Sequence, residues 1–179
     1  DGPPAGNRRG QKLKGPSFDD VEEDSGPGLR LKGNLNGFGL RIAVVASRYN
    51  RFVTSKLVEG ACEALLSHGL EEKDLTVSWV PGSFEVPLVA LEMARSGKWD
   101  ALVCLGALIR GETANFDHVA AEVVRGVAEA SRETGVPLAF GILTTYTKEQ
   151  ALERAGGKLG NRGYDAALAA LESANLLRL

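Results

Sequence analysis

Three short segments combine polar side chains with glycines, a composition typical of loops that bind small polar or anionic ligands. The first, residues 109–115 (IRGETAN), lies between an apolar run and an amphipathic helical pattern. Gly111, the Thr113 hydroxyl and the free amides at the start of the helix favour a phosphate, because these amides and the helix dipole both attract an anion. The alternative is that Thr113 simply caps the helix.

The second segment, residues 81–85 (PGSFE), follows another apolar run. Gly82 permits a tight backbone, Ser83 offers a hydroxyl, and Glu85 places a carboxylate at a helix start, which together suit a polyol or an amide. A carboxylate at that position also stabilises a helix without any ligand. Tyr49, just past the first apolar run, offers a flat face for a ring, with packing against the next helix as the alternative.

The third segment contains Arg154 and Lys158, separated by glycines near the end of a helical pattern. These cations could form a second anion-binding surface, although cations at a helix end also complement its dipole. Of the two histidines, His68 stands at a helix end and is interpreted as structural. His118 lies one turn into the helix after residues 109–115, and its spacing fits either a site or solvent.

Composition and charge exclude several classes of protein. The 179-residue chain is 44% hydrophobic with a net charge of −2, so a single domain with a substantial core is expected and no nucleic-acid partner is predicted. No apolar run approaches the roughly 20 residues of a membrane helix, so no membrane partner is predicted either. Cys62 and Cys104 lie in apolar segments without metal-binding spacing, which predicts free thiols, no metal and a cytoplasmic location, with a plastid as the alternative.

The elements that must position these segments alternate between strand and helix. Short β-branched runs predict strands over residues 41–46, 75–80, 100–108 and 136–144. Helical spacing of apolar residues predicts helices over residues 51–68, 86–95, 116–133, 148–155 and 164–177. The glycines at 156, 157, 160 and 163 are interpreted as the break between the last two helices.

This alternation predicts a three-layer, doubly wound α/β fold of flavodoxin-like type, with a four-stranded parallel sheet covered on both faces. Ligands in such folds bind beyond the carboxyl ends of the strands, which selects the loops at residues 47–50, 81–85, 109–115 and 144–147. Residues 33–39 have no partner in this pattern, and we predict a strand that pairs with a neighbouring subunit.

Residues 1–28 differ from the rest of the chain. They are rich in Gly and Pro, with a basic cluster followed at once by an acidic one. Few apolar side chains are present to offset the entropy of ordering, so we predict a flexible, low-complexity tail followed by one domain over residues 29–179.

Taken together, these loops make the chain resemble the lumazine synthase family. The resemblance extends from about residue 33 to the C-terminus. The matching segments are residues 48–50 (RYN), 80–87 (VPGSFEVP), 105–113 (LGALIRGET), 140–144 (FGILT) and 153–163 (ERAGGKLGNRG).

The resemblance implies a reaction without cofactor or metal. In it, a ribityl-aminouracil amine condenses with a dihydroxybutanone phosphate, and imine formation, phosphate loss and ring closure yield dimethyl-ribityllumazine. The residues implied to hold the ring and the ribityl chain are Tyr49, Asn50, Ser83, Phe84, Glu85, Ala107, Leu108 and Ile109. The residues implied to bind the phosphate are Glu112, Thr113 and Arg154. Phe140 matches an aromatic from the neighbouring subunit's side of the site, and Lys158 a basic residue near the pocket.

Two departures from the family pattern stand out. Asn115 occupies the position of a proton-shuttling histidine, and an amide does not titrate near neutral pH. Because loss of a general acid/base typically costs about 10²–10⁴ in rate, a slowed enzyme is predicted. His118 is a weak candidate to substitute for it. Arg162 stands where many members carry Lys and keeps the charge.

The resemblance also implies an assembly of pentamers with sites between adjacent subunits. The short linker at residues 156–163 lacks the insertion that accompanies pentamer-only members, which favours a 60-subunit shell. Two alternatives remain: a non-catalytic shell carrying an N-terminal peptide, favoured by Asn115, and a flavin-binding module. The second is disfavoured because residues 47–50 lack a hydroxyl-rich phosphate cradle.

Overall fold

The computed structural model describes residues 26–179, so all but the last three residues of the predicted tail lie outside the described part. Four parallel strands form the central sheet in the order β2-β1-β3-β4. Their bounds are Ile42–Ser47 (β1), Leu75–Val80 (β2), Ala101–Ile109 (β3) and Leu138–Thr145 (β4). The predicted doubly wound, four-stranded parallel sheet is therefore confirmed.

The central position of β1 explains its uninterrupted apolar sequence. All six of its residues are buried, because β2 and β3 flank it and helices cover both faces. Ile42 and Val44 pack into one hydrophobic core, whereas Ala43 and Val45 pack into the other. This alternation is what the two-residue repeat of a strand requires when both faces are covered.

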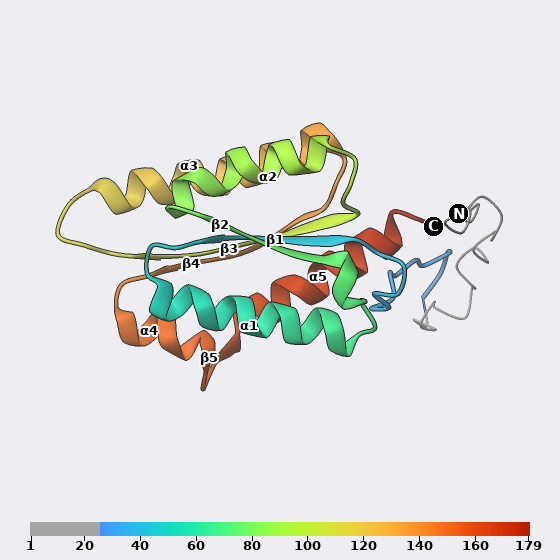
Figure 1. Cartoon of the computed structure of the whole chain (residues 1–179), viewed down its shortest axis with the longest axis horizontal. Coiled ribbons are helices and arrows are strands. Elements are labelled where there is room, and N and C mark those ends of the chain that lie inside the picture. The colour runs from blue at the N-terminus through green and yellow to red at the C-terminus, as the bar shows by residue number, and fades with distance from the viewer. Residues whose placement is uncertain (1–25) are drawn as a thin grey trace, which may run out of the picture.

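Helices form a layer on each side of the sheet, as Figure 1 shows. One layer consists of α1 (Arg51–Ser67), α4 (Lys148–Glu153) and α5 (Arg162–Leu176). The other consists of α2 (Val86–Arg95) and α3 (Asn115–Thr134). Short 3₁₀ turns, η2 (Glu72–Asp74) and η3 (Ser83–Glu85), precede β2 and α2. None of the described helices has the length and hydropathy needed to cross a membrane.

The start of α5 corrects two sequence-based predictions. The helix begins at Arg162 rather than at Tyr164, because the Asn161 side chain accepts hydrogen bonds from the backbone N–H groups of Gly163 and Tyr164. Gly163 therefore lies inside the helix and does not break it. A Cβ at Gly163 would stand 2.0 Å from the Leu57 carbonyl oxygen of α1, so the residue is needed for close helix contact.

The glycine-rich linker before α5 is not a simple break between helices. It forms a small antiparallel hairpin of β5 (Ala155–Gly157) and β6 (Gly160–Asn161). Gly156 and Gly160 have φ angles of 104° and 79°, which glycine adopts without steric cost. Sequence reasoning missed this hairpin because its strands are too short to show alternation.

Residues 33–39 are not a strand of the described sheet. The Asn175 side chain donates hydrogen bonds to the carbonyl oxygens of Asn34 (2.9 Å) and Asn36 (3.0 Å), and the Gly37 amide donates to His68 (2.7 Å). These contacts hold the segment against the ends of α1 and α5. Its pairing with a neighbouring subunit stays a prediction.

Candidate active site

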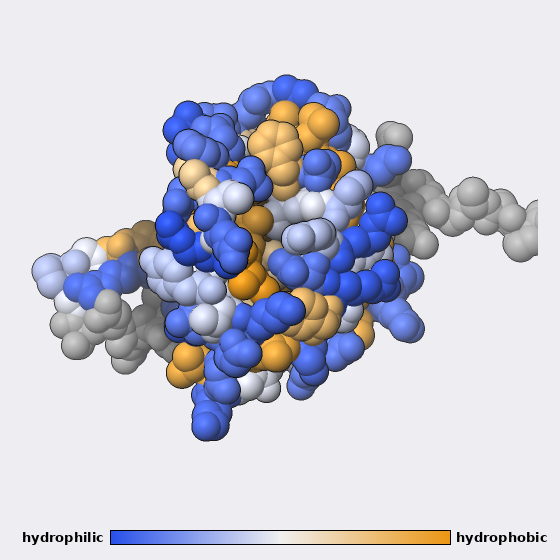
Figure 2. Space-filling model, turned by 90° about the vertical axis from the view of Figure 1, so that its left-hand side faces the viewer, coloured by the Kyte–Doolittle hydropathy of each residue, from blue (hydrophilic) through white to orange (hydrophobic). Residues whose placement is uncertain are grey.

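The four loops selected by the sequence lie at one end of the molecule, where the strands end. This end is on the left of Figure 1 and faces the viewer in Figure 2, which shows apolar patches among a mostly hydrophilic surface. Sheet-like hydrogen bonds continue past the strands: the Arg48 amide donates to the Val80 carbonyl and the Arg110 amide to that of Thr145, both at 2.8 Å. The loops therefore begin from fixed positions.

Two serine hydroxyls meet beneath these loops. Ser47, which ends β1, and Ser83, which begins η3, are both buried, and their Oγ atoms lie 3.4 Å apart. Gly106 of β3 makes room for them, because a Cβ there would lie 2.5 Å from Ser83 Oγ and 3.1 Å from Ser47 Oγ. The end of β1, the start of η3 and the interior of β3 thus meet around two buried hydroxyls.

Asn50 connects the loop after β1 to the end of β3. Its Nδ2 donates a 2.8 Å hydrogen bond to the Ala107 carbonyl oxygen. It is the only non-glycine residue with positive φ in the described chain (φ 59°), and its carbonyl accepts from the amides of Val53 and Thr54 at the start of α1. Asn tolerates this left-handed conformation better than most residues, which explains the residue type independently of any ligand.

The loop after β2 is stabilised by its own carboxylate. Glu85 Oε2 accepts a 2.8 Å hydrogen bond from the Gly82 amide, and the Glu85 amide donates to the Gly82 carbonyl oxygen at 3.2 Å, so the two residues hold the turn at the start of η3. Two aromatic side chains project at this edge, Tyr49 (72% exposed) and Phe84 (61% exposed). Such exposure leaves both rings free to stack on a planar ligand.

The start of α3 lacks a side-chain cap. Ala114 is the N-cap residue and no side-chain hydrogen bond satisfies the first amides, so the capping alternative for Thr113 is wrong. The helix begins one residue earlier than predicted, with Asn115 as its first residue. Residues 110–115, including Glu112, are all exposed. The free amides and the dipole of this 20-residue helix therefore face solvent.

A second group of predicted residues lies along β4, at the edge of the sheet. Phe140, Arg154 and Arg162 line one cavity of about 310 Å³ together with β4 residues Ile142, Leu143, Thr144 and Thr145. The Arg154 guanidinium donates to the Gln150 carbonyl oxygen (3.2 Å) and retains further donors. Two guanidinium groups on one small cavity suit an anion.

Within the described chain, the two groups do not share a cavity. None of Tyr49, Asn50, Ser83 or Glu85 lines the cavity that contains Arg154. Lys158 is exposed in the turn between β5 and β6, where its amide donates to Glu153 Oε2 (3.0 Å), and it does not line the cavity either. His118 is exposed on the first turn of α3.

Two residues lie within the loops that the sequence selected but were not singled out as site residues. Ser47 is a polar residue at the end of an apolar strand, and that position could have marked it. Arg110 contacts Asp117 and lies over two aromatic rings, although nothing in the local sequence indicates these partners.

The described residues provide neither a metal site nor a reactive thiol. No group of three or more His, Cys, Asp or Glu side chains is placed to hold a metal ion in residues 26–179. Burial raises the pKa of the Cys104 thiol to about 12 and also raises that of Cys62. Both thiols therefore stay protonated near neutral pH and are poor nucleophiles.

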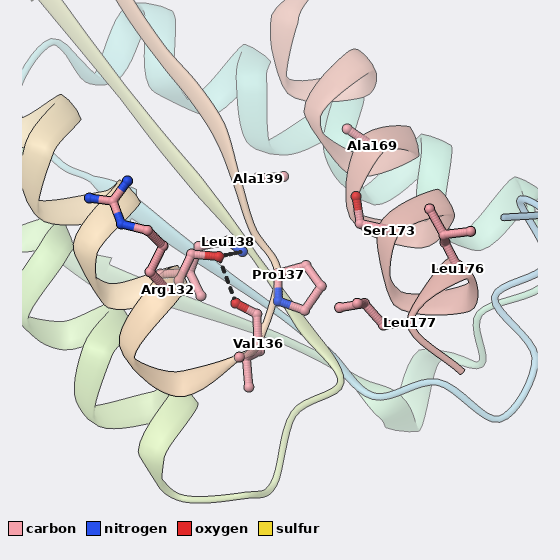
Figure 3. A pocket seen from close by; sticks show the side chains of 11 residues that line it. Arg132, Val136, Pro137, Leu138, Ala139, Ala169, Ser173, Leu176 and Leu177 are labelled. Atoms are coloured by element: carbon pink, nitrogen blue, oxygen red, sulfur yellow. Dashed lines mark hydrogen bonds between the residues drawn. The ribbon is translucent and has the colours of Figure 1, made fainter. Parts of the chain in front are cut away.

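A further groove lies at the opposite end of β4, away from these loops. It is mainly apolar, has a volume of about 510 Å³, and is lined by residues that include Pro137, Ala139, Leu176 and Leu177 (Figure 3). Its polar lining residues are Ser131, Arg132 and Ser173, and the remaining lining is apolar apart from Gly135, so the groove suits packing against another surface.

Comparison with known protein families adds one finding. A family model described as 6,7-dimethyl-8-ribityllumazine synthase matches residues 39–178. The match begins just before β1 and covers all the strands and helices of the described chain.

Proposed function

The chain belongs to the 6,7-dimethyl-8-ribityllumazine synthase family, whose members act as transferases in riboflavin biosynthesis, and we propose on that basis that it catalyses the family reaction. Its substrates are 5-amino-6-(D-ribitylamino)uracil and 3,4-dihydroxy-2-butanone 4-phosphate. The observation that carries this proposal is the family match, because it spans all four loops at the carboxyl end of the sheet.

The uracil and ribityl groups bind at the ends of β1, β2 and β3. Tyr49 stacks on the pyrimidine ring, and Phe84 adds apolar contact. Asn50, Ser83 and Glu85 supply amide, hydroxyl and carboxylate groups. Ala107, Leu108 and Ile109 contact the ring through their backbone. In support, the two aromatic rings are exposed, and the backbone beneath them is held by the Asn50–Ala107 hydrogen bond.

The phosphate of the second substrate binds at the start of α3. The turn containing Glu112 and Thr113 presents uncapped amides, and Arg154 of an adjacent copy pairs with the phosphate. The lack of a side-chain cap on α3 in the described chain supports this assignment, because the N-cap residue Ala114 has no side-chain acceptor that would compete with a phosphate.

Catalysis consists mainly of positioning. An amine and a ketone condense readily once they are held together, and a fixed geometry can supply about 7–11 kcal/mol of the barrier reduction. Phosphate loss and ring closure then require proton transfers. Asn115 hydrogen-bonds but does not titrate, so the enzyme is slower than a member with His at this position. Lys158 and Arg154 supply the positive charge near the leaving phosphate.

The site is completed by assembly. The chain forms pentamers in which Phe140, Arg154 and Lys158 of one copy meet Tyr49, Ser83 and Glu85 of the next, and twelve pentamers form a shell. Two observations support a homo-oligomer: among residues 26–179, β4 pairs only with β3 and leaves its other edge open, and an apolar groove lies beside that edge. Residues 33–39 are the segment we expect to cover the edge of the neighbour.

The test is an assay of purified protein with both substrates at neutral pH, followed by lumazine absorbance, beside the spontaneous reaction. Turnover above the spontaneous rate, carried by particles of pentamer size or larger, is expected. Particles of that size with no turnover in the parent or in Asn115→His would instead support the second candidate, a non-catalytic shell, which Asn115 favours.

A further inference from the structure

Arg110, the first residue after β3, makes contacts in three directions. Its Nη1 and Nη2 each lie 3.3 Å from a different carboxylate oxygen of Asp117 in the first turn of α3. Its guanidinium carbon lies 5.7 Å from the ring centroids of both Phe116 and Tyr146. Its backbone amide donates to the Thr145 carbonyl oxygen at 2.8 Å. One residue therefore joins the end of β3, the start of α3 and the loop after β4.

These contacts close the turn formed by residues 111–114. The Arg110–Asp117 pair spans the turn from one side to the other, and the two hydrogen bonds of the fork restrict both distance and orientation. Lys has no planar fork and could not reproduce this geometry. The two aromatic rings further restrict the guanidinium, since each lies within the roughly 6 Å range of a cation–π contact.

The turn itself has little else to hold it. Its four residues are exposed, and no side-chain hydrogen bond caps the helix that follows. Asp117 also puts a negative charge in the same helical turn as the uncapped amides, where it opposes an incoming anion. If Asp117 acted only through its charge, neutralising it would strengthen anion binding at the turn.

We infer that Arg110 is a positioning residue, which acts through its fork to Asp117 and its contacts with Phe116 and Tyr146 to preset the anion-binding turn before the phosphate arrives. The inference rests on the proposed function for the identity of the anion. It does not require turnover, because preorganisation of the turn can be measured with inorganic phosphate alone.

The experiment compares Arg110→Gln, Asp117→Asn and the double variant with the parent, in the assembled full-length protein. Arg125→Gln is the matched control, because Arg125 also pairs with a carboxylate on α3, Glu122, through an exposed contact of 3.5 Å. The readouts are the Kd of inorganic phosphate, hydrogen exchange of the amides at residues 111–117, and KM for each substrate.

Both single variants should weaken phosphate binding by about tenfold and speed amide exchange in the turn, and the double variant should be no worse than Arg110→Gln. KM should rise for the phosphate-bearing substrate only, with kcat changed less. Arg110→Lys should recover little, and Arg125→Gln should match the parent.

Tighter phosphate binding in Asp117→Asn with weaker binding in Arg110→Gln would overturn the inference, since that pattern reports charge alone. Unchanged exchange in the turn would overturn it as well. Failure of the proposed function is distinguishable, because the parent would then show no turnover while the phosphate and exchange measurements still decide the role of Arg110.

Discussion

The side-chain amide of Asn50 donates a 2.8 Å hydrogen bond to the carbonyl oxygen of Ala107, 57 residues away in the sequence. This bond joins the loop after β1 to the end of β3, and the Asn50 backbone is left-handed (φ 59°). The two features can be separated by substitution, because Ala loses both the hydrogen bond and the tolerance of positive φ, whereas Gly loses only the hydrogen bond.

We expect Asn50→Gly to lower the free energy of unfolding by about 1 kcal/mol, and Asn50→Ala by about 1 kcal/mol more. Denaturant unfolding of the parent and both variants would measure the difference in unfolding free energy between Asn50→Gly and Asn50→Ala, provided that the m-values of the three proteins are equal. Equal losses in the two variants would mean that the left-handed backbone relaxes and costs nothing.

Gly106 leaves the space in which the Ser47 and Ser83 hydroxyls meet. Gly106→Ala should destabilise the protein by about 1–3 kcal/mol, because the new Cβ would lie 2.5 Å from Ser83 Oγ. Ser83→Ala removes that atom, so the double variant should lose less stability than the sum of the single variants. If the losses of stability in the two single variants were additive, the strain would lie elsewhere, for example at Ile142, whose Cγ2 is 3.3 Å from the Cβ built at position 106.

Asn115 is exposed at the first position of α3. Asn115→His should raise kcat by about 10²-fold or more, because a titrating group then assists proton transfer. The pH profile should also acquire a limb near the ordinary pKa of His, about 6.5. His118→Asn is the control, and a large loss of activity in that variant would show that His118 already supplies the proton transfer.

Arg154 and Arg162 line the same cavity, but we expect substitution of Arg154 to change KM more than substitution of Arg162. Arg154→Gln should raise KM for the phosphate-bearing substrate by about 10- to 100-fold, because a charge-assisted contact is lost. Arg162→Lys should stay close to the parent, since the charge is retained. A KM increase for the uracil substrate in Arg154→Gln would contradict the assignment of this arginine to the phosphate.

Cys104 provides a prediction about alkaline stability. Burial raises its pKa from the ordinary value of 9.0 to about 12. In the pH range from 9 to 12 the unfolded chain has lost this proton while the folded chain keeps it, so the stabilisation present below pH 9 is lost as pH rises. Between pH 9 and 12 the free energy of unfolding should therefore fall less steeply in Cys104→Ala than in the parent, with a difference in slope of up to about 1.4 kcal/mol per pH unit.

Thiol labelling supplies the independent check for Cys104. At pH 8 a thiol-specific reagent should label unfolded protein at both cysteines but leave Cys104 unmodified in the folded state. Rapid labelling of Cys104 in the folded protein, or parallel pH curves for the parent and Cys104→Ala, would contradict its burial.

The sequence by itself determined the element types and the end of the sheet where the candidate site lies. Apolar runs such as residues 41–46 and amphipathic patterns such as residues 116–133 depend only on side-chain periodicity, which is a local property. The carboxyl-end rule then selected the loops containing Tyr49, Ser83 and Thr113 without any coordinates.

Only the tertiary structure decided which distant groups meet. Ser47 reaches Ser83 because β1 and β2 are neighbours, and residue 163 must be glycine because α5 crosses close to Leu57 of α1. The separation of the Arg154 cavity from the loops around Tyr49 follows likewise from strand order, with β4 at the sheet edge. Such relationships depend on strand order and helix contact across many residues, and no short stretch of sequence encodes them.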